Sequence, residues 1–307
     1  MRSTIEETLA TLGRRYVRDA PVSVGKAALA ARFLNPYLRD HPRRRVSEAL
    51  FGARFAVDTR DLIQRYVYLF GIWEPNMTGW LQGRLRPGDT FVDVGAHVGY
   101  FSMLASRLVG DSGQVVAIEA SPEFYGRLRH HVSLNGLGNV RAVNAAVSDR
   151  RETLTFILAS SINTGANSIV PYDGPVESSF EAESRPLPDL LEPAEVAHAR
   201  IIKVDVEGAE GKVARGLTPL LDQLRPEAEI TIEVTPERMA QLGDSVDELM
   251  ETMARAGFHA YRLANDYAPA SYPPALRQPA AVPKRLRGRV NGESDLIFSR
   301  VDADELP

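Results

Sequence analysis

From residue 90 onward, short apolar runs alternate with stretches whose apolar residues recur at helical spacing. The apolar runs have the length and composition of buried strands, and in chain order they read TFVDVG, QVVAIEA, VRAVNAAVS, RIIKVDVEG, AEITIEV and DLIFS. Residues 101–108, 123–134 and 209–220 carry the helical patterns. Strands that alternate with helices predict an α/β fold in which helices cover both faces of a mostly parallel sheet.

The N-terminal part of the chain has a different pattern. Apolar residues recur at helical spacing up to residue 34, where Asn35-Pro36 predicts the end of the helix. Residues 45–58 predict a hairpin with its turn near Gly52, and residues 75–85 predict a helix with Pro75 in its first turn. We therefore expect a helical and hairpin extension over residues 1–70 and an α/β domain over residues 71–307.

Two segments interrupt the alternation of strands and helices. Residues 150–199 form a long insertion containing Ser, Asn, Gly and Pro, and loops of this length in compact domains are commonly binding elements. We expect substrate contacts there. Residues 268–284 are rich in Pro, Ala and Tyr and predict irregular chain before the last strand.

Composition narrows the class of protein. The 307 residues carry a formal net charge of −4, so no basic excess favours nucleic acid or an anionic membrane, and we interpret the basic clusters at 41–45 and 284–289 as solvated surface. The absence of cysteine excludes disulfides, thiolate metal sites and a cysteine nucleophile. No signal-like or membrane-spanning apolar stretch is visible. We expect a cytoplasmic protein that binds neither nucleic acid nor membrane.

The strongest local motif is FVDVGAHVGYFS at residues 91–102, an apolar strand that runs into a glycine turn and a helix. Gly95 can let the main chain approach a ligand, Gly99 permits close packing of helix on strand, and free amides at the helix start can meet an anion. The G-x-x-x-G spacing differs from the G-x-G-x-x-G of dinucleotide sites, which disfavours NAD and FAD. Asp93 suits the amino group of an amino-acid-bearing cofactor.

Acidic residues follow the next two strands of the pattern. Glu119 ends the second strand, where a carboxylate can accept both hydroxyl groups of a ribose or cap the following helix. The end of the third strand, at Val147 and Ser148, is expected to border the same crevice. Asp149 could contact an adenine ring there or occupy a turn.

Asp205 and Glu207 follow the fourth strand, and strand alternation directs both side chains the same way. Two carboxylates at a crevice could accept a proton from an acceptor hydroxyl, orient it, or share a divalent cation. Alternatively, these acidic residues could stabilise the N-terminus of the following helix, and this second interpretation accounts for Glu210. Glu233 is the corresponding acidic residue on the fifth strand.

Together these motifs resemble the FkbM family of S-adenosylmethionine-dependent methyltransferases. The resemblance is carried by GIWEP at 71–75, PGD at 87–89, FVDVGAHVGYFS, IEASPE, NAAVSD, Asn163-Thr164-Gly165, IKVDVEGAE and the terminal DLIF. It implies a Rossmann-like class I methyltransferase fold with a mostly parallel seven-stranded sheet and a reversed final hairpin. It also implies S-adenosylmethionine as methyl donor and O-methylation of a small molecule.

The resemblance also implies site residues. By matching position, it places the cofactor against the following residues: Glu74, Asp93, Gly95, Ala96, Gly99, Phe101, Ser102, Glu119, Ala120, Ser121, Val147, Ser148 and Asp205. Asp205 and Glu207 would lie near the transferred methyl group. Either of them or His97 could act as general base, although the His97 ring could instead pack beneath the cofactor. Mg²⁺ held by Asp205, Glu207 and Glu233 is compatible with the sequence but not required by it.

Two other functions remain open at this point. An NAD-dependent oxidoreductase would need the missing G-x-G-x-x-G, and a non-catalytic binding protein could keep the same fold. For the enzyme, the expected acceptor is a hydroxyl of a sugar, glycan or secondary metabolite, with Trp73, Tyr100, Tyr172 and residues 163–168 around it. The N-terminal helices could cover this acceptor or form a homodimer.

Overall fold

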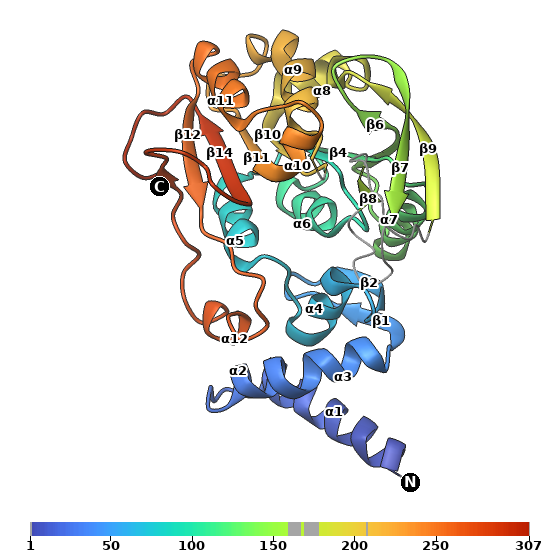
Figure 1. Cartoon of the computed structure of the whole chain (residues 1–307). Coiled ribbons are helices and arrows are strands. Elements are labelled where there is room, and N and C mark those ends of the chain that lie inside the picture. The colour runs from blue at the N-terminus through green and yellow to red at the C-terminus, as the bar shows by residue number, and fades with distance from the viewer. Residues whose placement is uncertain (1, 159–166, 169–177, 207, 307) are drawn as a thin grey trace. The chain divides into compact units, whose positions relative to one another are not determined.

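The computed structural model describes residues 2–158, 167–168, 178–206 and 208–306 of the chain (Figure 1). The chain folds into two compact units. Of the described residues, the first unit contains 2–80 and 265–280, and the second contains 81–158, 167–168, 178–206, 208–264 and 281–306. No helix among the described residues is long and apolar enough to cross a membrane.

An eight-stranded sheet forms the centre of the second unit. Its strands in spatial order are β13 (Lys284–Arg285), β12 (His259–Leu263), β14 (Ser294–Ser299), β11 (Glu229–Val234), β10 (Ala199–Val204), β3 (Thr90–Val94), β4 (Gln114–Glu119) and β5 (Val140–Asn144). The strands from β11 to β5 pair in parallel, and β14 runs antiparallel to β11 and β12. The seven strands from β12 to β5 confirm the predicted sheet with its reversed final strand. The two-residue β13 is an edge strand that the sequence did not predict.

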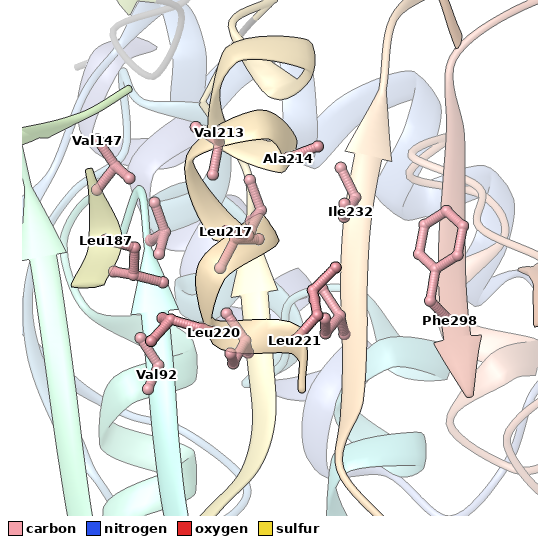
Figure 2. Close-up of a cluster of buried hydrophobic side chains, with 14 of the residues drawn as sticks. Val92, Val147, Leu187, Val213, Ala214, Leu217, Leu220, Leu221, Ile232 and Phe298 are labelled. Atoms are coloured by element: carbon pink, nitrogen blue, oxygen red, sulfur yellow. The ribbon is translucent and has the colours of Figure 1, made fainter. Parts of the chain in front are cut away.

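Helices cover both faces of this sheet (Figure 1). One face carries α6 (Tyr100–Val109) and α7 (Pro122–Asn135), and the other carries α8 (Pro193–His198), α9 (Glu210–Leu221) and α11 (Val246–Arg255). Val92 and Val94 of β3 belong to the hydrophobic core beneath α9, where they join Leu217 (Figure 2). Since side chains alternate along a strand, Asp93 points to the opposite face, toward α6. A short helix, α10 (Pro236–Gln241), follows β11.

The insertion at residues 150–199 contains strands where a loop was expected. β7 (Glu152–Leu158) and β9 (Ser178–Arg185) pair antiparallel along the whole of β7, and β6 (Ala146–Val147) and β8 (Asn167–Ser168) complete a four-stranded sheet. Phe156 stacks on Phe180 with ring centroids 4.9 Å apart. A 3-10 turn (Leu187–Asp189) leads from β9 to α8. Asn163, Thr164, Gly165 and Tyr172, which were expected near the acceptor, lie outside the described residues.

The first unit contains helices and the predicted hairpin. Its helices are α1 (Arg2–Asp19), α2 (Lys26–Leu29), α3 (Asn35–Asp40), α4 (Leu62–Phe70) and the first part of α5 (Pro75–Arg84). The hairpin pairs β1 (Arg44–Glu48) with β2 (Arg54–Asp58), and Gly52 in its turn has a φ of 84°. A positive φ suits glycine because it has no Cβ.

Pro36 does not end the N-terminal helical segment, contrary to the prediction. The chain continues from α2 through one π-helical turn (Ala30–Leu34) into α3, where Pro36 lies in the first turn. The wider turn shifts the hydrogen-bonding register. As a result, the proline falls at a position where a helix does not need its N–H.

Residues 265–280 complete the first unit. They contain a single helical turn, α12 (Tyr272–Ala275), within a stretch that was predicted to be irregular. The Tyr272 ring is fully buried, stacks on Phe70 at 4.9 Å between ring centroids, and meets Tyr66 edge-on at 4.6 Å. These aromatic contacts join two stretches of chain that are far apart in sequence.

The two basic clusters have partners within the chain. Arg44 pairs with Asp58, and Arg285 pairs with Asp302. Arg43 differs from the predicted solvated surface because it is buried and donates to the Tyr68 hydroxyl at 3.0 Å.

Candidate functional site

The glycine turn after β3 lies directly against the chain that leaves β10. Gly95 has a φ of 85°, and a Cβ placed on it would lie 1.8 Å from the carbonyl oxygen of Asp205. Gly99, with a φ of 84°, precedes α6, and its Cβ would lie 2.4 Å from Leu128 of α7. Both glycines therefore permit close approach of protein to protein, and the expected approach of the main chain to a ligand at Gly95 stays a prediction.

The amides of this turn are largely used within the protein. The N–H groups of Gly95 and Ala96 both donate to the carbonyl of Ile118, and that of Gly99 donates to the carbonyl of Ala96. These three amides already donate within the protein, and the expected binding of an anion by free amides at the start of α6 stays a prediction. The bonds to Ile118 tie the turn to the end of β4.

Glu119 at the end of β4 connects the turn to the following helix. Its Oε2 accepts the His97 N–H at 2.8 Å, and its Oε1 accepts the Ser121 N–H at 2.8 Å. Each carboxylate oxygen keeps a second lone pair with which it can accept another hydrogen bond. Burial raises the pKa of Glu119 to about 7, and the charges of Asp93 and Asp205 act in the same direction.

The neighbours of Glu119 have structural partners of their own. The Ser121 hydroxyl caps α7 by accepting the Phe124 N–H at 3.4 Å, and the Ala120 carbonyl accepts from the Asn144 side chain at 3.0 Å. His97 has a φ of 51°, and its ring lies 4.0 Å from that of Phe124. The His97 ring thus packs against α7.

A second group of charged residues spans the ends of β3 and β10. Asp93 is 1% exposed and accepts the Ser102 hydroxyl at 2.5 Å. Burial raises the pKa of Asp93, and the positive charge of Lys203 opposes this shift. Lys203 stands opposite Asp93 in the strand register, donates to Asp205 Oδ2 at 2.8 Å, and lies 5.0 Å from the centroid of the Phe101 ring. The structure thus brings together Asp93, Phe101, Ser102 and Asp205, and their contact with the cofactor stays a prediction.

Lys203 was missed by the sequence reasoning. A lysine inside the run IIKV is unusual in a buried strand, because lysine is almost never fully buried without a partner. That position was the available signal, and it indicates an acidic neighbour within the sheet.

Val147, Ser148 and Asp149 do not join this group. Val147 lies in the hydrophobic core beneath α9 (Figure 2). The Ser148 carbonyl would be 2.3 Å from a Cβ at Gly216 of α9, and Asp149 pairs with Arg215 of the same helix. Packing against α9 and this ion pair are the contacts described for these residues, and their expected contact with the cofactor stays a prediction. The short β6, which contains Val147, pairs with β9.

Glu74 belongs to the first unit and has an unusual backbone. Its φ is 42°, its side chain is buried, and Oε1 accepts the Tyr267 hydroxyl at 3.3 Å. Its N–H donates to the Tyr272 hydroxyl at 3.3 Å. The GIWEP motif is therefore held by residues 265–280, a pairing that the sequence did not reveal.

The remaining acidic candidates divide into three cases. Glu207 lies outside the described residues. Glu233 is half-buried and faces Asp295 in the register of β11 and β14. From the sequence, Glu210 was interpreted as an acidic residue that stabilises a helix N-terminus. It is buried, and burial raises its pKa to about 7. The described residues contain no group of three His, Asp or Glu side chains that could hold a metal ion.

The carboxyl groups of the second unit fit S-adenosylmethionine. Glu119 is a buried carboxylate whose two oxygens each accept one backbone N–H and can accept one more hydroxyl. The carboxyl groups of Asp93 and Asp205 would suit a ligand that carries a sulfonium and an ammonium group. These are the groups that would bind the ribose and favour the cationic part of the cofactor.

The comparisons with known proteins agree with this chemistry. The chain is similar to the hexuronic acid methyltransferase AglP of Haloferax volcanii, with 26% identity over 174 residues that cover 57% of this chain and 68% of that protein. It is 32% identical over 82 residues to the protein-L-isoaspartate O-methyltransferase of Fervidobacterium nodosum, which covers 26% of this chain and 40% of that protein.

A likeness to solved structures also exists. The methyltransferase FkbM structure from Methylobacillus flagellatus KT has a TM-score of 0.40 and 13% identity, covering 77% of this chain and 52% of that one. The profile of the methyltransferase FkbM domain matches residues 93–260. Since this match spans more than half of the chain, the protein belongs to the FkbM family of S-adenosylmethionine-dependent methyltransferases.

Proposed function

We propose that the protein methylates a hydroxyl oxygen of a sugar. The observation that carries the proposal is the Asp205 carboxylate. Its side chain is 29% exposed, and one of its oxygens is held by Lys203. The relative named for hexuronic acid methylation supports a sugar as the class of acceptor.

Asp205 would act on the acceptor. S-adenosylmethionine, when bound, supplies an electrophilic methyl group on its sulfonium. A neutral hydroxyl has to lose its proton as its oxygen forms a new bond, and a carboxylate within hydrogen-bonding distance can take that proton. The partial exposure of Asp205 gives the proton a path to water.

Glu119 would hold the cofactor. Its two oxygens are fixed by the N–H groups of His97 and Ser121, so their remaining lone pairs have set directions for the two ribose hydroxyls. Such preorganised acceptors bind a ligand without losing further conformational freedom.

The cofactor part of the proposal is tested by isothermal titration with S-adenosylmethionine. Glu119→Gln keeps the size of the side chain but removes the charge, and we expect affinity to fall about tenfold or more, since a hydrogen bond to a charged group contributes about 1.5–3 kcal/mol. Glu123→Gln is the matched control, because Glu123 is an exposed residue of α7 paired with Arg127. A folded wild type that does not bind S-adenosylmethionine would refute the proposal.

The acceptor part is tested with methyl-labelled S-adenosylmethionine and the methyl glycosides of glucuronic acid, galacturonic acid, glucose and galactose. A methyl ether on a hydroxyl survives alkali, whereas a methyl ester on the uronic acid carboxyl is hydrolysed. We expect alkali-stable label, and we expect Asp205→Asn to lower the transfer rate on the order of 100-fold or more. Label that alkali releases, or no transfer to any of the four sugars, would contradict methylation of a sugar hydroxyl.

A further inference from the structure

Lys203 is a buried cation in the middle of an apolar strand. Its side chain is 5% exposed, while its neighbours Ile202 and Val204 belong to the hydrophobic core on the other face of the sheet. Removing an ammonium group from water is costly unless anions and hydrogen bonds offset the loss. A lysine at this position therefore needs anionic partners close by.

Residues of β3, of the chain after β10 and of α6 surround the Lys203 ammonium group. Nζ donates to Asp205 Oδ2 at 2.8 Å, and Asp93 is the partner of Lys203 in the register with β3. The ring of Phe101 on α6 lies 5.0 Å from Nζ, within the range of a cation–π interaction. The ammonium group therefore has a defined position.

The two carboxylates beside Lys203 differ in their access to solvent. Asp93 is 1% exposed and accepts the Ser102 hydroxyl. Asp205 is 29% exposed, and within the described part of the chain only Lys203 donates to its side chain, at Oδ2. Asp205 is therefore the carboxylate of this cluster that a ligand can reach, and its Oδ1 accepts no hydrogen bond from the described residues.

We propose that Lys203 is a positioning residue, which anchors Oδ2 of Asp205 so that Oδ1 is held for the acceptor hydroxyl. This inference rests on the proposed function. The acceptor oxygen bonds to the methyl carbon, the bond from that carbon to sulfur breaks with its electron pair staying on sulfur, and the hydroxyl proton passes to Asp205 Oδ1 and then to water. Misplacing a reacting group by about 1 Å can slow a reaction on the order of 100-fold.

The first test compares Lys203→Met with Lys203→Arg, using the methyl glycoside of glucuronic acid as acceptor. For Lys203→Met we expect kcat to fall on the order of 100-fold, with the Kd of S-adenosylmethionine from isothermal titration little changed. For Lys203→Arg we expect most of kcat to return, because arginine keeps the charge and the donors. Lys212→Met is the matched control, since Lys212 on α9 pairs with Glu152 at 3.9 Å and should retain the wild-type kcat.

A double-mutant cycle separates positioning from a general structural role. If Lys203 acts through Asp205, then Lys203→Met should cost little more in kcat once Asp205→Asn is present. A second loss of equal size in that background would overturn the inference, because Lys203 would then act on another group.

A second variant serves as a control for loss of folding. Lys203→Met leaves Asp93 without its buried cation, so Lys203→Met/Asp93→Asn removes both charges, and circular dichroism reports whether each variant folds. We expect the folded double variant to lose at least as much kcat as Lys203→Met, and a folded double variant with the wild-type kcat would overturn the inference. If wild type transfers no methyl group to any of the four sugars, the proposed function fails. If wild type is active and Lys203→Met matches Lys212→Met, the role of Lys203 alone is overturned.

Discussion

Glu210, the first residue of α9, has a buried carboxyl group with one oxygen unused. Oε1 accepts the Gly208 N–H at 2.8 Å, and Oε2 has no hydrogen-bond partner among the described residues. Burial raises its pKa from the usual 4.5 to about 7. Between these values the folded protein holds a proton that the unfolded chain releases. The contribution of Glu210 to stability is therefore full below pH 4.5 and is lost as the pH rises through 7.

Glu210→Gln should stabilise the protein at high pH. The amide keeps an oxygen for the Gly208 N–H and carries no charge, and the shift corresponds to about 3 kcal/mol. We expect the free energy of unfolding in urea to exceed that of wild type by up to about 3 kcal/mol above neutral pH and to match it in acid. Glu237→Gln, at an exposed position of α10, is the control. Equal stability of the two variants at high pH would contradict the expectation.

Individual residues were predictable where they end a strand. Glu119 ends an apolar run, Asp205 follows one, and Asp93 is the last residue but one of a third, and parallel strands bring such positions to one edge of the sheet. The burial of Glu210 was not predictable, because it depends on how α9 packs on the sheet. Lys203 was overlooked, although a lysine among apolar residues of a strand indicates a buried charge with a partner.

At the scale of elements, the turn after β3 and the chain after β10 depend on each other through Gly95. A Cβ at Gly95 would lie 1.8 Å from Asp205 O, so the two segments would have to separate. Gly88, in the turn before β3, has a similar φ of 91°, but the nearest atom to its Cβ would be 3.9 Å away. A comparison of alanine substitutions at Gly95 and Gly88 therefore separates the cost of steric crowding from the cost of backbone strain.

Gly95→Ala should be far more damaging than Gly88→Ala. For Gly88→Ala we expect a loss of about 1–2 kcal/mol in the free energy of unfolding, which is the cost of a left-handed backbone for a residue with a Cβ. For Gly95→Ala we expect a clearly larger loss and weakened binding of S-adenosylmethionine in isothermal titration. Similar losses in both variants would show that the turn can open without cost.

Elements of the central sheet were easier to predict than those around it. The strands and α6, α7 and α9 have strong apolar patterns, because they are buried on one or both sides. β7 has an apolar end, but it lies in a long insertion whose Ser, Asn, Gly and Pro residues led to the prediction of a loop. The π-helical turn before Pro36 depends on packing within the first unit and has no simple pattern.

At the scale of the whole molecule, residues 265–280 supply part of the first unit. Tyr272 fills the space beside Tyr66 and Phe70, and Tyr267 stacks on Trp73 with ring centroids 5.3 Å apart. Both tryptophans of the chain, Trp73 and Trp80, belong to this unit. Tryptophan fluorescence therefore reports on the first unit. The homodimer expected from its N-terminal helices stays a prediction.

Tyr272→Ala should destabilise the first unit. Removing a fully buried aromatic ring typically costs about 3–5 kcal/mol, and we expect a loss of this size when urea unfolding is followed by tryptophan fluorescence. Tyr125→Ala, at a half-buried tyrosine of α7, is the control. A fluorescence transition that moves no further for Tyr272→Ala than for Tyr125→Ala would contradict a structural role for residues 265–280.

The late return of the chain to the first unit also has a consequence for synthesis on the ribosome. Residues 81–264 must be made after the first eighty residues and before the segment that completes them. At roughly 5–20 residues per second, this interval lasts on the order of ten to forty seconds. Throughout it, the nascent chain carries Tyr66 and Phe70 without the ring that covers them, so that newly made molecules pass through a stage with exposed aromatic side chains that finished ones do not have.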